Sequence, residues 1–182
     1  MMNLLASATA PSAPGLPDDL SLYLGKKTLV KLILEAIQVW NGEPLDYRGF
    51  ASAGKTFQQP MLLTLLTYCY ATGVYASTEI ELNIERDPMT RYLCARTYPN
   101  IDVIRGFRRF NVLQIKQCLT AVLNRAWQLR FSGEDEEPTC DTSYAALSMS
   151  RWSGRSPAPD FNREADDRVA KAVRADSMAL DV

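Results

Sequence analysis

Residues Gly49 to Thr56 spell GFASAGKT and match the phosphate-loop pattern G-x-x-x-x-G-K-[ST]. In that motif backbone N–H groups hold the phosphates of a nucleotide, the lysine reaches the terminal phosphates, and the hydroxyl binds Mg²⁺. A working phosphate loop follows a buried strand and opens directly into a helix. Here Pro44 and two acids precede the motif, and Pro60 follows it and disfavours helical geometry at Gln59. We therefore expect no nucleotide binding. It is the least favoured of the three functional hypotheses that this sequence suggests.

The chain of 182 residues contains no histidine. This excludes Ser–His and Cys–His catalytic pairs and His-rich zinc sites. Its four cysteines stand far apart, at Cys69, Cys94, Cys118 and Cys140. We expect reduced thiols, three of them in the core, and the alternative is a structural zinc site made by all four. We expect no cofactor and no metal-binding residue.

Charge is distributed unevenly, although the net charge is only −1. Residues 21–131 hold 14 Lys and Arg against 8 Asp and Glu, whereas residues 132–182 hold 6 against 11. A basic part followed by an acidic part points toward a polyanion partner. The alternative is ordinary variation of surface charge.

Apolar residues recur at helical spacing through the first two-thirds of the chain. Residues 28–40 follow the i, i+3, i+4, i+7 pattern, and Asn41-Gly42 ends that helix. Pro60 opens a helix to about Gly73 that is apolar on all sides, which predicts a buried central element. Further helices are expected over 78–86 with a Thr78/Glu81 capping box, after the cap Asp87, from Ile101, and over 112–129. No strand pattern is evident, so the predicted fold is all-α, a compact bundle of five or six helices.

Composition divides the chain into three parts. Residues 1–24 are rich in Ala, Ser and Pro and are expected to be disordered, residues 25–131 form the helical domain, and residues 132–182 form an acidic, mostly disordered tail. A charged helix over 161–178 is predicted in the tail, with Asp160 as its cap and a weak apolar stripe of Val169, Ala172, Val173 and Met178. The acids Glu134, Asp135, Glu136, Glu137 and Asp141 are interpreted as a solvated run rather than a metal site.

No segment is predicted to lie in a membrane. The most apolar run, residues 61–76, is interrupted by Thr64, Thr67 and Gly73 and is too short to span a bilayer. The first residues lack the positive charge of a secretory leader. We expect a soluble cytoplasmic protein.

The basic residues concentrate in 91–130, which holds eight Lys and Arg against the single acid Asp102. With Ile101, Ile104 and Phe107 facing inward, the arginines of the same helix are expected to face outward. Near residues 101–130 a short helix, a turn and a longer helix form a helix-turn-helix-like pair, and exposed Arg, Lys, Asn and Gln there suit phosphates and base edges. The predicted DNA-binding residues are Arg91, Arg96, Arg105, Arg108, Arg109, Lys116 and Arg125.

Two alternatives compete with DNA binding at this face. In the first alternative, the face is a solvated basic surface of a helical bundle. In the second, it is a patch that pairs with the protein's own acidic tail. Residues 134–141 in particular are candidates to occupy the face and compete with DNA.

The order of motifs over residues 25–130 resembles the N-terminal domain of bacterial insertion-sequence transposases. A Gly-basic-x-aromatic-x-x-Pro loop, here Gly54-Lys55-Thr56-Phe57 with Pro60, precedes an apolar helix. A small-residue turn and an S-x-x-[IL]-E helix start follow at Ser77 to Glu81, then an Asp that opens a helix, Asp87. A Pro-[DN] turn at Pro99-Asn100 leads into F-R-[RK] at Phe107 to Arg109. On this resemblance the GKT triplet belongs to the family's loop and has no phosphate function.

The resemblance implies a helical domain that binds the DNA ends of the element or helps to assemble the complex. In that family a following RNase-H-like domain carries three metal-binding acids for strand transfer, and this sequence departs from the pattern after Arg130. A catalytic domain needs a sheet, which 51 residues of this composition do not supply. The leading hypothesis is a truncated transposase that binds DNA without strand-transfer chemistry. The alternative is a dimerisation module that regulates a full-length transposase, as a homo-oligomer or by mixed assembly.

Overall fold

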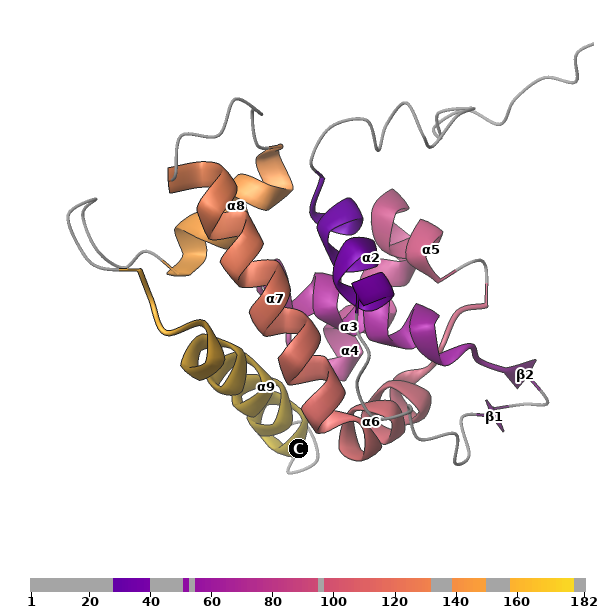
Figure 1. Cartoon of the computed structure of the whole chain (residues 1–182). Helices are drawn as coiled ribbons and strands as arrows, with labels where there is room; N and C mark the ends of the chain where they lie inside the picture. Colours follow the sequence, from indigo (N-terminus) through magenta and orange to yellow (C-terminus); the bar gives the residue numbers. More distant parts are fainter. Residues whose placement is uncertain are drawn as a thin grey trace, which may run out of the picture.

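The computed structural model describes residues 28–39, 51–52, 55–94, 97–131, 139–149 and 158–178. Within them the chain forms eight helices (Figure 1): α2 Leu29–Val39, α3 Gln59–Ala71, α4 Ser77–Arg86, α5 Pro88–Leu93, α6 Ile101–Phe110, α7 Val112–Phe131, α8 Cys140–Met149 and α9 Phe161–Met178. The predicted all-α class is confirmed. Six of the described helices lie before residue 132, and α8 and α9 lie in the tail, where one helix, over 161–178, was predicted. The predictions for residues 1–24 fall outside the described residues.

Two very short strands lie before α3. Strand β1, Ala51–Ser52, pairs antiparallel with β2, Lys55–Thr56, with Ala51 opposite Thr56 and Ser52 opposite Lys55. No strand was expected, since two residues are too few to show the alternation by which a strand is recognised in a sequence.

Helices α3 and α7 form the centre of the fold. As predicted, α3 is buried on almost all sides, and its Leu62, Leu65 and Leu66 are fully inaccessible. Helix α7 packs against α2, α3, α8 and α9, and Figure 1 shows it crossing the molecule, with α8 crossing its upper part and α9 beside its lower part. Its buried row is Ile115, Leu119, Val122, Ala126 and Leu129, at helical spacing. One apolar core therefore joins the first helix described to the last.

Local caps fix several helix starts. Asp87 accepts a hydrogen bond from the backbone N–H of Thr90 at 2.7 Å, and Asp160 accepts one from Arg163 at 3.1 Å, so both predicted caps are confirmed. The predicted Thr78/Glu81 capping box is wrong. Helix α4 begins at Ser77 after Ala76, whose side chain caps nothing.

The largest difference from expectation is in the tail. Helix α8 was not predicted, and both α8 and α9 are packed into the core rather than disordered. The inward face of α8 is Thr142, Ala145, Ala146 and Met149, and that of α9 is Ala165, Arg168, Val169, Ala172 and Asp176. Both sets follow helical spacing, but small and charged residues occupy many of the positions, so apolar periodicity does not reveal them. Val173 and Met178, predicted to be in the stripe, are exposed.

No helix in the described part of the chain is both long enough and apolar enough to cross a bilayer. The longest, α7, has 20 residues, but polar and charged side chains interrupt it along its length.

Candidate functional site

The arginines of α6 do not share one environment. Arg109 is exposed, the side chain of Arg105 is 23% exposed, and that of Arg108 is only 6% exposed. The expectation that all three face outward is therefore wrong for Arg108. It lies one turn after Ile104, and Ile104, Phe107, Arg108 and Asn111 together form a buried i, i+3, i+4, i+7 row. Arg108 was assigned to the wrong face because only apolar residues were counted.

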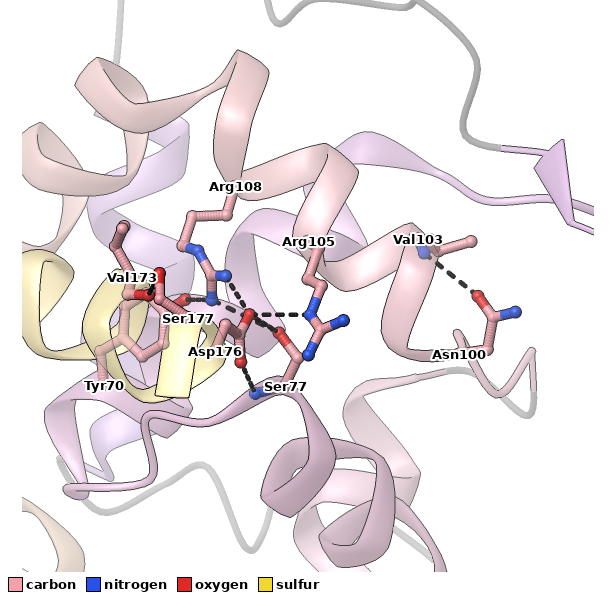
Figure 2. Close-up of polar contacts among 9 residues, drawn as sticks. All are labelled: Tyr70, Ser77, Asn100, Val103, Arg105, Arg108, Val173, Asp176 and Ser177. Atoms are coloured by element: carbon pink, nitrogen blue, oxygen red, sulfur yellow. Dashed lines mark hydrogen bonds and ion pairs between the residues drawn. The ribbon is translucent and has the colours of Figure 1, made fainter. Parts of the chain in front are cut away.

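Arg108 belongs to a buried polar cluster, here called the Asp176 cluster, formed by Tyr70, Ser77, Arg105, Arg108 and Asp176 (Figure 2). The Asp176 carboxylate accepts hydrogen bonds from the Ser77 backbone N–H at 2.8 Å and from the Ser77 hydroxyl at 2.6 Å. It also forms ion pairs with Nη2 of Arg108 and, at 3.2 Å, with Nε of Arg105. Arg108 in turn donates to the Tyr70 hydroxyl at 3.1 Å. Helices α4 and α6 supply the donors to the carboxylate, α9 supplies the carboxylate, and Tyr70 of α3 accepts from Arg108.

Asp176 caps α4 from a distance in the sequence. The N–H of Ser77 is one of the first four of α4, which have no partner within the helix and lie at its positive end. The local residue Ala76 has no side-chain acceptor, and a carboxylate 99 residues away takes its place.

Arg168 performs the complementary role at the end of α3. Gly73, at φ +88°, closes α3 with a hydrogen bond from Val74 N–H to Cys69 O at 2.8 Å. Nη1 of Arg168 then donates to the carbonyls of Tyr70 and Ala71 at 2.8 and 2.9 Å. The residue is 1% exposed. Helix α9 thus holds both sides of the turn between α3 and α4, Arg168 at the negative helix end and Asp176 at the positive one.

The pKa values in the cluster follow from burial and charge. Burial by itself raises the pKa of Asp176, but the hydrogen bonds from Ser77 and the charge of Arg108 outweigh it, and the pKa lies below the ordinary Asp value. Burial raises the pKa of Tyr70 to about 12, although Arg108 acts in the opposite direction. At neutral pH the cluster therefore contains an ionised Asp176, a charged Arg108 and a neutral Tyr70.

The other predicted DNA-binding residues are dispersed. Lys116 on α7 forms an ion pair with Asp166 of α9 at 2.8 Å, and Arg125 donates to Gln128 Oε1 at 3.3 Å. Arg91 is exposed and donates to the carbonyls of Ile84, at 3.4 Å, and Glu85, near the end of α4. Arg96 lies outside the described residues.

The basic residues thus meet the tail through helix α9. Asp166 and Asp176 of α9 pair with Lys116, Arg105 and Arg108. Of residues 134–141, the structure describes 139–141, and Asp141 accepts a hydrogen bond from the N–H of Leu29 at 3.2 Å, at the start of α2. Asp141 is therefore a structural cap and not part of a solvated run. Residues 134–137 lie outside the described part.

The GKT triplet does not open a helix. Lys55 and Thr56 form β2, and α3 begins only at Gln59. Their only described sheet partner is β1, in an antiparallel pair, whereas a phosphate loop follows a parallel strand and leads straight into a helix.

The cysteines behave largely as expected. Cys69, Cys94 and Cys118 are buried in the core, Cys140 is exposed, and all four are free thiols. Burial raises the pKa of Cys94 to about 12 and that of Cys118 to about 11, so both stay protonated near neutral pH. Among the described residues, no three potential ligands come together as a metal site.

Comparison with known proteins finds no relative of this chain. No family model matches the chain, and no curated protein or solved structure matches it significantly. The resemblance to transposases consequently stays a hypothesis drawn from the motifs.

The site residues that could not be identified from the motifs and the apolar pattern are Asp176, Arg168 and Ser77. A signal for two of them was present: the spacing of Ala165, Arg168, Val169, Ala172 and Asp176 is that of a buried face. Two opposite charges at inward positions of a helix that is otherwise lined by small residues indicate buried polar anchors. Part of their partners could not be found in the same way, because those partners are backbone groups of α3 and α4.

Proposed function

We propose that this chain is a DNA-binding and assembly domain of the kind found at the N-terminus of insertion-sequence transposases, without strand-transfer chemistry of its own. The observation that supports it most is α6, which carries three arginines in ten residues, two of them, Arg105 and Arg109, accessible to solvent one turn apart. A guanidinium group binds a phosphate through paired hydrogen bonds. Helix α6 is joined to α7 by the single residue Asn111, and this pair is the helix-turn-helix-like unit of the proposal.

The residues proposed to contact DNA differ in their solvent exposure and in whether an ion pair already holds them. Arg109 is exposed and serves as the principal phosphate contact, with Arg105 beside it. Lys116 is held by Asp166, whose side chain is 58% exposed, and an ion pair so open to water contributes little and yields to a phosphate. Arg91, Arg96 and Arg125 complete the proposed set, and the DNA ends of a mobile element are the proposed partner.

A salt titration of DNA binding tests this proposal. Affinity for a mixed-sequence duplex, measured by fluorescence anisotropy, should fall linearly with salt on logarithmic axes, because each neutralised phosphate releases counterions. The Arg109→Ala variant should bind more weakly, with a slope shallower by about 0.9 for the one lost phosphate contact.

The matched control is Arg174→Ala, which removes an exposed arginine from α9 and should leave the slope unchanged. Absence of salt-dependent binding by the wild-type protein would contradict the proposed function. An unchanged slope in Arg109→Ala would contradict the site.

A second candidate function is a protein-interaction module that regulates a transposase by assembly. Two large apolar side chains, Phe110 and Leu113, are 45% and 53% exposed at the junction of α6 and α7. The apolar surface of α3 is buried inside the chain and is not available for association. Burying a large apolar side chain contributes about 1.5–3 kcal/mol, so burial of both would contribute about 3–6 kcal/mol per subunit to association.

Light scattering separates this candidate from the first. If the module dimerises through this junction, the double variant Phe110→Ser/Leu113→Ser should weaken the dimer by more than tenfold. Leu82→Ser, which removes a 40%-exposed leucine from α4, is the control and should leave the mass unchanged. A wild-type monomer at all concentrations would rule out self-association, and a stable dimer without DNA affinity would favour this candidate over DNA binding.

A further inference from the structure

The donors of the Asp176 cluster have the composition of an oxyanion site. Around one carboxylate converge the Ser77 N–H at the start of α4, the Ser77 hydroxyl, and two guanidinium groups, those of Arg105 and Arg108. Helix N-termini and arginine pairs are the usual means by which proteins bind phosphate. The site is built in advance, since the Tyr70 hydroxyl accepts from Arg108 and helps to hold its side chain in place.

The anion in this site comes from a different part of the chain than its donors. Every donor lies between residues 77 and 108, on helices α4 and α6, whereas the carboxylate lies in the last turn of α9 (Figure 2). The helix ends at Met178. The arrangement is thus a donor set on α4 and the proposed DNA-binding helix α6, occupied by an acid in the last turn of α9.

The last turn of α9 is held almost entirely by polar contacts. Ala172 is the last fully buried apolar residue of the helix, while Val173, Ser177 and Met178 are exposed. Releasing this turn therefore breaks the contacts of Asp176 and exposes little additional apolar surface. Helix ends open more readily than helix centres, because they have fewer backbone hydrogen bonds to lose.

We propose that Asp176 stands in for a phosphate group, and that release of the last turn of α9 opens the Ser77–Arg105–Arg108 site to a backbone phosphate of DNA. The choice of DNA as the source of the phosphate rests on the proposed function. Asp176 then acts as an internal competitor that keeps the site filled in the free protein. Arg105, the most exposed of the cluster's charged side chains, marks the edge at which the phosphate enters.

Inorganic phosphate is the first probe, and thermal unfolding of the full chain is the readout. In Asp176→Ala the carboxylate is gone and the donors remain, so phosphate should raise Tm relative to chloride at equal ionic strength. At ten times the measured dissociation constant we expect a rise of about 3–6 °C. The wild type and the control Asp167→Ala, which removes an exposed acid of the same helix, should show no phosphate-specific rise.

A second variant guards against loss of the fold. Asp176→Asn keeps a side-chain carbonyl for Ser77 and Arg108, and phosphate should raise its Tm in the same direction. If Asp176→Ala is unfolded in chloride, phosphate should restore its helical circular dichroism. Equal Tm values in phosphate and chloride for both variants, or an Asp176→Ala that stays unfolded in phosphate, overturn the inference.

Duplex DNA is the second probe and separates this inference from the proposed function. Asp176→Ala should bind DNA with a salt slope steeper by about 0.9 than Asp167→Ala, which has the same net charge. Equal slopes in a protein that binds DNA overturn the inference and leave the proposed function standing. A phosphate-specific rise in Tm without DNA binding by any variant supports the phosphate site and overturns the proposed function.

Discussion

Arg168→Met should lower the free energy of unfolding by about 3–5 kcal/mol, the loss typical of breaking a buried, hydrogen-bonded charge network. The guanidinium donates to the carbonyls of Tyr70 and Ala71, to the Ser148 hydroxyl, and to Glu164. Methionine keeps much of the apolar stem and removes the donors. Each buried carbonyl left without a partner costs about 1–3 kcal/mol.

The stability lost in Arg168→Met is not recovered by apolar packing, because two of the hydrogen-bond acceptors belong to the backbone. A buried ion pair can often be replaced by apolar side chains without cost, provided that both partners are replaced. Here two partners are main-chain carbonyls at the end of α3, which no substitution removes.

Urea unfolding followed by circular dichroism at neutral pH gives the measurement. The matched control is Arg174→Met on the same helix, where the arginine is exposed, and we expect a change within about 0.5 kcal/mol. A loss below about 1 kcal/mol in Arg168→Met would show that these hydrogen bonds do not hold α9 to the α3–α4 turn.

Asp176→Asn should be the second most damaging change, and its effect should depend on pH. At neutral pH it leaves Arg108, 6% exposed, without its counter-ion, and we expect a loss of about 3 kcal/mol. The pKa of Asp176 is lowered in the folded state, so its stabilising contribution is complete above the unfolded pKa of about 4. That contribution disappears as the pH falls through the folded pKa.

The free-energy difference between wild type and Asp176→Asn should therefore be constant from about pH 5 to 7 and shrink below about pH 4. Urea unfolding across this range measures it. Asp167→Asn, at an exposed position of α9, should show little difference at any pH. A gap between wild type and Asp176→Asn that does not change with pH would contradict the role assigned to the ionised carboxylate.

A double-mutant cycle separates the ion pair from the rest of the cluster. Arg108→Met and Asp176→Leu should each be costly alone, because each leaves one buried charge without its main partner. The double variant should cost less than the sum of the two, by at least about 1 kcal/mol. Additive effects would mean that the two residues do not stabilise the fold as a pair.

Most helices could be predicted from the sequence because their signals are local. Helices α2 and α7 carry apolar stripes at helical spacing and α3 is apolar on all sides. Asp87 and Asp160 cap the helices that directly follow them. Helix α8 could not be predicted in this way, since its buried face consists of Thr142, two alanines and Met149. Small side chains are buried there because the neighbouring helix α7 comes close.

Caps supplied from distant residues escape local reasoning altogether. The start of α2 is bonded by Asp141, the end of α3 by Arg168 and the start of α4 by Asp176. The capping-box rule placed the cap of α4 at Thr78, because that rule considers only four neighbouring residues at the start of a helix. The actual acceptor is 99 residues away and arrives only when α9 packs on the bundle.

The sequence by itself determined that this protein is helical, that its basic residues cluster in 91–130 and that its last third is acidic, since composition and periodicity are properties of the chain. Only the tertiary structure decided which charges face water. Arg108 and Asp176 are buried together and Lys116 meets Asp166, whereas Arg109 remains exposed. The physical reason is that burying a charge is too costly without a partner, and the partners are brought within reach by the docking of α9.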